Sequence, residues 1–257
     1  MPRGSPRASR AGGRAKPRGR ASRHPRGLAT LAIDIGGTGL KASVLDEAGT
    51  MLVDRVRVET PVGSPPEVIV EALAKLTEPL PPFDRVSVGF PGVVRDGRVL
   101  TAPNLKHDTW MGFDLAAALR NRLGKPTRVV NDADMQGLAA IQGKGVELVI
   151  TLGTGFGTAL YLDGRLAPHL ELAHHPFRKG ETYEEQLGNG ARKQAGTTKW
   201  NKRIQRAIEC LRALVHFDHL YIGGGNARKI AFKPGPDITI ISNEAGIRGG
   251  IALWRDA

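Results

Sequence analysis

Cysteines and long apolar runs are both scarce in this 257-residue chain. The single cysteine, Cys210, excludes an internal disulfide and any zinc site built from several cysteines. No apolar run reaches the ~18–20 residues of a membrane-spanning helix, and no apolar signal-peptide segment follows the N-terminus. We therefore expect no membrane partner and a cytoplasmic protein.

Two common phosphate-binding motifs are also missing. No G-x-x-x-x-G-K-[ST] sequence occurs, and no G-x-G-x-x-G follows a predicted strand. A P-loop and a Rossmann fingerprint are thus excluded, although the length and the 40% hydrophobic content suit an enzyme with two modest α/β lobes.

The net charge of +12 is concentrated at the N-terminus. Residues 1–27 contain eight Arg and one Lys without an acid, which leaves only +3 for the other 230 residues. This segment lacks the apolar residues that could offset its ordering entropy, so we predict a disordered tail. It could bind nucleic acid, bind another polyanion, or precede the true start of the protein, and we favour a dispensable tail.

Two glycine-rich turns are the main pattern. The first joins an apolar strand (residues 28–35) to a second strand (41–45) and supplies Asp34, Gly36, Gly37, Thr38, Gly39 and Lys41. Glycines at such a turn let backbone N–H groups approach an anion. Lys41 adds positive charge, and the carboxylate of Asp34 suits Mg²⁺, directly or through water.

The same pattern recurs about 117 positions later, where residues 150–163 can be aligned with residues 33–46. This second turn supplies Gly153, Thr154, Gly155 and Gly157. Either turn alone could be an ordinary hairpin. The repetition predicts two similar lobes whose turns hold a phosphate chain from both sides of a cleft.

The remaining patterns predict an α/β fold in which each lobe is a mixed sheet flanked by helices. The first lobe (28–131) should hold a third strand at 51–60, a helix at 66–77 with a capping box from Ser64, a strand at 85–90, a hairpin at 93–100, a helix at 115–123 capped by Asp114, and a strand at 127–130. The second lobe (132–244) should hold a helix after Asp132, a hairpin at 146–162, a helix at 199–215 capped by Thr198, and strands at 218–222 and 237–241. A C-terminal helix (about 245–257) should pack near the lobe junction.

Asn131 and Asp132 end a predicted strand at the start of a helix. That position is the carboxyl edge of a sheet, where α/β folds bind ligands. Asp132 could accept the proton of a hydroxyl that attacks a phosphoryl group, or it could simply cap the helix.

The two turns and this pair resemble the motifs of the ROK sugar kinases, which have an actin/hexokinase-like (ribonuclease H-like) fold. The resemblance continues in Glu171-Leu172-Ala173-His174 and Glu184, and it spans about residues 28–255. It implies that Asp132 is the catalytic base and that glucose is bound by Asn104, Asn131, Asp132, Glu171, His174 and Glu184. It also implies Mg²⁺ as the cofactor.

The chain departs from the usual ROK pattern at two places. Ala173 replaces a glycine, and the cysteine-rich zinc motif is absent from residues 177–183. We therefore expect no zinc. Because it lacks this zinc motif, the chain is most similar to the ROK kinases that use polyphosphate.

A basic segment supports a polyphosphate donor. Six basic residues precede the first acid of the helix at 199–215: Arg192, Lys193, Lys199, Lys202, Arg203 and Arg206. They could form a track for a polyanion or merely a solvated face. Gly223, Gly224 and Gly225 resemble the adenosine-side motif of the fold, so ATP stays open as a donor.

The resemblance thus implies a glucokinase that transfers a phosphoryl group from polyphosphate to the 6-hydroxyl of glucose, with ATP as an open alternative donor. A ROK kinase for mannose or N-acetylglucosamine is one alternative. A sugar-responsive repressor is another, although 27 Arg/Gly/Pro-rich residues cannot supply a helix-turn-helix, so we expect no specific nucleic-acid partner. Family analogy implies a homodimer.

Overall fold

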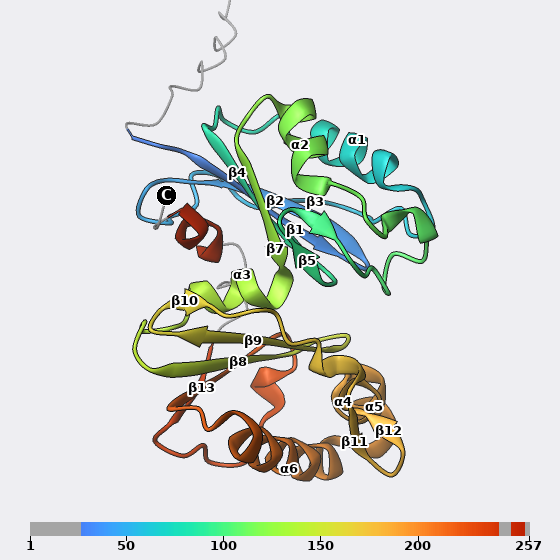
Figure 1. Ribbon diagram of the computed structural model, residues 1–257, viewed down its shortest axis with the longest axis vertical. Coiled ribbons are helices and arrows are strands. Elements are labelled where there is room, and N and C mark those ends of the chain that lie inside the picture. Colours follow the sequence, from blue (N-terminus) through green and yellow to red (C-terminus); the bar gives the residue numbers. More distant parts are fainter. Residues whose placement is uncertain (1–26, 242–247, 255–257) are drawn as a thin grey trace, which may run out of the picture.

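Two five-stranded mixed sheets, each built from one half of the chain, form the frame of the protein (Figure 1). The computed structural model describes residues 27–241 and 248–254. The tail predicted to be disordered lies, apart from Gly27, outside the described residues.

The first sheet has the strand order β3-β2-β1-β4-β7. Its antiparallel part consists of β1 (Thr30–Gly36), β2 (Gly39–Leu45) and β3 (Val56–Val58), and β4 (Arg85–Phe90) and β7 (Thr127–Asn131) extend it in parallel from β1. Helices α1 (Pro66–Thr77) and α2 (Leu115–Leu123) cover one face (Figure 1). A small hairpin, β5 (Val94–Arg95) and β6 (Arg98–Val99), and the 3₁₀ helix η1 (Asp108–Trp110) complete this half.

The second sheet repeats this plan in the order β10-β9-β8-β13-β14. The antiparallel strands are β8 (Val146–Leu152), β9 (Phe156–Leu162) and β10 (Arg165–Leu166), and the parallel strands are β13 (His219–Gly223) and β14 (Ile238–Ile240). In both sheets a hairpin with a glycine turn provides the central strand, so the internal repeat predicted from the two turns is present in the topology.

The remaining helices of the second half lie along one face of its sheet (Figure 1). They are α4 (Tyr183–Leu187), α5 (Asn189–Ala195) and α6 (Thr197–Val215). The short hairpin of β11 (Pro176–Arg178) and β12 (Glu181–Thr182) precedes them, and this half also contains the 3₁₀ helices η2 (Leu172–His174) and η3 (Ala227–Lys229). In the part of the chain that the structure describes, no helix is long and apolar enough to cross a bilayer.

Each half buries its own core. The first is centred on Trp110 and the apolar residues of β1, β2 and β4, and the second on Trp200, Ile204 and Leu211 of α6 packed against β8 and β13. Helix α3 (Asp132–Leu138) contacts strands of both sheets. We propose the lobe boundary at the start of α3, as the sequence predicts.

Most predicted elements are present. Asp114 caps α2 by accepting a hydrogen bond from the N–H of Ala117 (2.9 Å), and Gly124 ends this helix in the left-handed conformation (φ 66°). The hairpin at 93–100 turns at Asp96 and Gly97, which both have positive φ. These features depend on residue types with strong local preferences.

Two predicted caps are wrong. The N-cap of α1 is Pro65, which has no side-chain oxygen, so Ser64 forms no capping box. Helix α6 begins at Thr197 instead of after Thr198, because Gly196 both ends α5 and starts α6.

Two predicted elements are shorter or of another type. The strand predicted at 51–60 forms only as Val56–Val58, because the chain bends at Leu52 and Val53, whose carbonyl accepts a hydrogen bond from Ser43. The described part of the C-terminal helix is the 3₁₀ helix η4 (Gly249–Trp254), and residues 245–247 and 255–257 lie outside the described residues.

The sequence predicts that this C-terminal element packs near the lobe junction. Helix η4 packs against α3, β1 and β4 at the lobe junction. Its first two residues are glycines in tight contact, since a Cβ on Gly249 would overlap the carbonyl of Met135, and Ser87 donates a hydrogen bond to the carbonyl of Gly250 (2.7 Å).

Candidate active site

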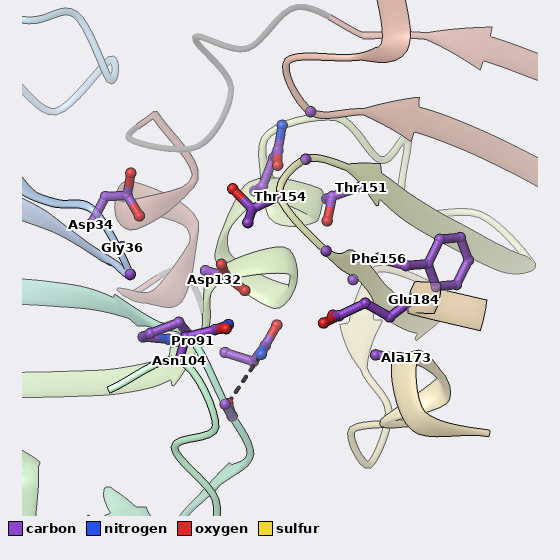
Figure 2. A pocket seen from close by; sticks show the side chains of 18 of the residues that line it. Asp34, Gly36, Pro91, Asn104, Asp132, Thr151, Thr154, Phe156, Ala173 and Glu184 are labelled. Atoms are coloured by element: carbon purple, nitrogen blue, oxygen red, sulfur yellow. Dashed lines mark hydrogen bonds between the residues drawn. The ribbon is translucent and has the colours of Figure 1, made fainter. Parts of the chain in front are cut away.

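A cleft of about 520 Å³ lies between the two halves and is lined by loops from both (Figure 2). The two glycine turns line it from opposite sides, and Asp132 lies at the start of α3 between them. The predicted site residues that it brings together are Asp34, Gly36, Gly37, Thr38, Lys41, Asn104, Asn131, Asp132, Gly153, Thr154, Gly155, Gly157, Glu171, His174, Glu184, Gly224 and Gly225.

The first turn places a charged pair in the cleft. Lys41 Nζ lies 2.8 Å from Asp34 Oδ2, and both side chains are about one-third exposed, at 30% and 27%. The ammonium group of Lys41 therefore has a carboxylate partner already. Gly39 does not line the cleft, because it pairs with Gly36 across the start of the hairpin and its Cβ position faces the side chain of Arg57.

The second turn is fixed by two asparagines that follow distant elements. Asn226 donates from Nδ2 to the carbonyl of Gly153 (3.0 Å) and from its backbone N–H to Leu152 (2.8 Å). The N–H of Asn189 bonds the carbonyls of Gly153 and Thr154. These bonds hold the turn in one shape before any ligand arrives.

Asn131, not Asp132, caps helix α3. Its Oδ1 accepts from the N–H groups of Ala133 (2.8 Å) and Asp134 (3.4 Å), and its Nδ2 donates to the carbonyl of Gly92 (3.0 Å). Asn131 thus has one amide N–H left for a ligand. Asp132 is the first residue of the helix and points its carboxylate into the cleft (Figure 2), so the capping alternative for Asp132 does not hold.

The environment of Asp132 favours a proton acceptor. Burial raises its pKa, as do the negative charges of Asp34, Asp134 and Glu171, and a hydrogen bond from the N–H of Ala133 opposes them. Together they bring the pKa to about 7. A carboxylate with this pKa can both accept and release a proton near neutral pH.

The candidate sugar-binding groups lie at the same end of the cleft. Asn104 faces Asp132 from the first half, and Glu184 faces it from α4 (Figure 2). Gly155 has no room for a side chain, because a Cβ there would overlap the carboxylate of Glu184. Glu171 lies 3.6 Å from Nε2 of His169, whose Nδ1 lies 3.1 Å from Asp134.

Of the three glycines predicted to bind the nucleotide, two line the cleft and one does not. Gly224 and Gly225 line the cleft, whereas Gly223 does not, because it ends β13 and its Cβ position faces Gln136 and Ile241. Gly224 has φ +84° and packs against the backbone of Leu152, which brings this segment beside the second glycine turn.

Four of the six residues of the predicted basic track lie together, and the other two do not lie with them. Lys199, Lys202, Arg203 and Arg206 line a separate pocket with Arg178 and Lys179. Arg192 and Lys193 line neither this pocket nor the cleft. Arg192 instead donates to Oδ1 of Asn189 (3.0 Å).

Several cleft residues escaped the sequence analysis: Arg55, Gln136, Thr151, Asn189 and Asn226. Thr151 and Asn226 each adjoin a predicted glycine motif, which is a usable signal. Arg55, Gln136 and Asn189 carry no signal of this kind, because only the folding of separate segments brings them to the cleft.

The donors around Asp132 fit a magnesium ion. Asp34 and Asp132 offer carboxylate oxygens, and Thr38, Thr151 and Thr154 offer hydroxyls. Mg²⁺ usually takes one or two carboxylates and completes its shell with water and substrate phosphates. Among residues 27–241 and 248–254 no group of three or more His, Cys, Asp or Glu is placed to hold a metal.

Comparison with known proteins identifies the family. The ROK family model matches residues 30–169, which is more than half of the chain. The polyphosphate glucokinase of Mycobacterium tuberculosis (strain CDC 1551 / Oshkosh) is 30% identical over 209 residues, covering 77% of this chain and 78% of that protein. The chain belongs to the ROK family.

Solved structures agree with this assignment. The inorganic polyphosphate/ATP-glucomannokinase from Arthrobacter sp. strain KM is 34% identical to this ROK protein, with a TM-score of 0.79 over 88% of this chain and 97% of that chain. The ROK family glucokinase from Streptomyces griseus, solved with glucose and AMPPNP, is 22% identical with a TM-score of 0.67 over 89% of this chain and 100% of that chain, and shares the fold. The fold is therefore actin/hexokinase-like, and the enzyme class is sugar kinase, as predicted from the sequence.

Proposed function

We propose that this ROK protein is a glucokinase that transfers the terminal phosphoryl group of inorganic polyphosphate to the 6-hydroxyl of glucose, giving glucose 6-phosphate, with ATP as an alternative donor. The observation that carries the proposal is the position of Asp132, with a pKa raised to about 7, between two glycine turns in one cleft. The names of the relatives from Mycobacterium tuberculosis and Arthrobacter support polyphosphate as donor.

Asp132 acts as the general base in this proposal. It accepts the proton of the 6-hydroxyl as the oxygen attacks the terminal phosphorus, and the bond from that phosphorus to the bridging oxygen breaks. Asn104, Asn131, Glu171, His174 and Glu184 hold the other sugar hydroxyls. Carboxylates and amides suit this task because each can make two directed hydrogen bonds to a polyol.

The two glycine turns and Lys41 bind the donor phosphates. Backbone N–H groups that are already fixed in position stabilise the charge that develops during transfer without reorganising. Asp34, directly or through water, would hold Mg²⁺, which supplies further neutralisation of phosphate charge when bound.

We assign nucleotide binding to two of the three glycines that the sequence predicts for it. Gly224 and Gly225 line the cleft and could accept the flat base of ATP, whereas Gly223 lies behind them and is left with a packing role. Family analogy leads us to propose a homodimer and a cytoplasmic location as well.

A coupled assay for glucose 6-phosphate, with mass spectrometry of the sugar phosphate when another sugar is the acceptor, tests the proposal. The purified full chain is given long-chain polyphosphate, tripolyphosphate or ATP with Mg²⁺, and glucose, mannose or N-acetylglucosamine as acceptor. We expect glucose-dependent product with polyphosphate. Product with ATP alone would contradict the proposed donor, and a higher kcat/KM for N-acetylglucosamine than for glucose would contradict the proposed acceptor.

A further inference from the structure

A pocket of about 440 Å³ on the second half is lined only by basic side chains. Arg178 is the last residue of β11 and Lys179 lies in the turn that follows it, and the others come from the first half of α6. We call this pocket the basic pocket: Arg178, Lys179, Lys199, Lys202, Arg203 and Arg206. It is separate from the cleft that holds Asp132, with which it shares no lining residue.

The charge of the basic pocket is largely uncompensated. Of the six cations of the basic pocket, only Arg206 has a carboxylate partner among the described residues, which is Glu209 at 3.0 Å. Both of these side chains are 66% exposed, so the ion pair between them is weak. Like charges gathered in one hollow repel each other and lower stability. A bound polyanion would relieve this repulsion, whereas a single small anion would neutralise only part of the positive charge of the pocket.

Two of the cations are held in place by one buried residue. Gln186 is 3% exposed, and its Oε1 accepts a hydrogen bond from Nη1 of Arg178 (3.1 Å). The backbone carbonyl of Gln186 accepts from Nη1 of Arg203 (3.2 Å). The hairpin and α6 are therefore joined across the pocket, which gives it a defined shape.

Helix α4 connects the basic pocket to the cleft. Glu184 of this helix lines the cleft, and Gln186, two residues later, contacts the basic pocket. Asn189, at the start of α5, lines the cleft and accepts a hydrogen bond from Arg192. A chain that runs from the glycine turns to the basic pocket must pass a helix about 10 Å across. Only an anion with several phosphates can reach both places.

We propose that the basic pocket is a remote subsite that binds the distal part of a linear polyphosphate while its terminal phosphate lies at Asp132. This inference rests on the proposed function and adds two hairpin residues, Arg178 and Lys179, to the donor site, while it leaves out Arg192 and Lys193. It follows that the enzyme binds long chains more tightly than short ones, and that the difference arises far from the reacting atoms.

The test compares two triple charge reversals in the full chain. The pocket variant is Lys179→Glu, Lys199→Glu and Lys202→Glu, at exposed side chains. The control variant is Arg120→Glu, Lys144→Glu and Arg165→Glu, which are exposed on α2 and at the end of the second sheet away from its glycine turn. Both variants change the net charge equally, so the long-range field is matched.

We expect the pocket variant to raise KM for long-chain polyphosphate roughly tenfold or more, with a shallower salt dependence, because phosphate contacts are lost. KM for tripolyphosphate, ATP and glucose should stay within about twofold in both variants. Equal effects of the two variants, or a parallel rise for tripolyphosphate, would overturn the proposal.

Direct binding separates this inference from the proposed function. Fluorescence anisotropy of labelled long-chain polyphosphate is measured with both variants, with single-stranded RNA as competitor. Loss of polyphosphate binding in the pocket variant alone supports the subsite even if the wild type used only ATP. Unchanged binding overturns it, as does tighter binding of RNA than of polyphosphate, which would assign the pocket to nucleic acid.

Discussion

At the scale of single residues, the structure explains why Asp132 suits proton transfer. Most surface aspartates are fully ionised at neutral pH and are weak bases. Burial at the start of α3 and the nearby charge of Asp34 raise the pKa of Asp132 to about 7, while Asn131 takes over the capping of the helix. The neighbouring residue thus frees Asp132 from a structural task.

Replacing this base should separate chemistry from folding. Asp132→Asn keeps the shape of the side chain but cannot accept the proton, so turnover should fall about 10²–10⁴-fold. The melting temperature and the dissociation constant for glucose, measured by calorimetry, should change little. A variant with wild-type turnover would show that another group is the base.

The raised pKa also predicts a pH profile. Because the base acts in its ionised form, kcat/KM for glucose should rise with pH and reach half of its maximum near the pKa of Asp132, about 7. A flat profile between about pH 5 and 8 would be inconsistent with this role.

A second titrating group contributes to stability. The His169 side chain is 7% exposed, and it lies 3.1 Å from the buried carboxylate of Asp134. Burial lowers the pKa of His169, but hydrogen bonds to Asp134 and Glu171 outweigh this effect and raise the pKa to about 9. The folded state therefore holds this proton more tightly than the unfolded chain, whose histidine titrates near 6.5.

It follows that this stabilisation is complete below about pH 6.5 and is lost as the pH rises through 9. The loss should amount to about 3 kcal/mol or less. Urea unfolding of the wild type and His169→Gln at pH 6 and pH 9.5 checks this: the difference between them should be large at pH 6 and small at pH 9.5. His175→Gln, at an exposed histidine, is the matched control.

At the scale of elements, the second glycine turn depends on contacts from elsewhere in the chain. Asn189 and Asn226 bond the carbonyl groups of this turn, and Gly155 leaves room for the carboxylate of Glu184. The turn is therefore a product of three segments, although its glycines are adjacent in sequence.

Gly155→Ala should displace Glu184, because the added Cβ would overlap its carboxylate. Misplacement of a sugar-binding group should raise KM for glucose at least about tenfold, as measured in the coupled assay. Gly190→Ala is the control, since nothing lies within 4 Å of its Cβ position. Equal glucose KM values for the two variants would argue against Glu184 as a sugar ligand.

At the scale of the whole molecule, the duplicated topology is what creates the site. Each half has a hairpin whose glycine turn ends at the interface with the other half, and α3 joins the two sheets. The cleft belongs to neither half, since both turns, Asn104 and Glu184 are needed to enclose Asp132. The C-terminal 3₁₀ helix η4 packs at the same junction and ties the end of the chain to α3.

The sequence alone determined the features that depend on local chemistry. Glycine turns between apolar strands, the Asp114 cap and the Asp96-Gly97 hairpin follow from residue types with strong backbone preferences, and the repeat of the turns predicted the repeat of the sheets. Only the tertiary structure decided that Asn131 is the cap and Asp132 a half-buried acid in the cleft, and that Lys41 is paired with Asp34. It also decided that Arg178 lines the basic pocket with α6 while Arg192 does not. Pairing, burial and shared cavities arise between segments far apart in the chain, and no local pattern of residues specifies them.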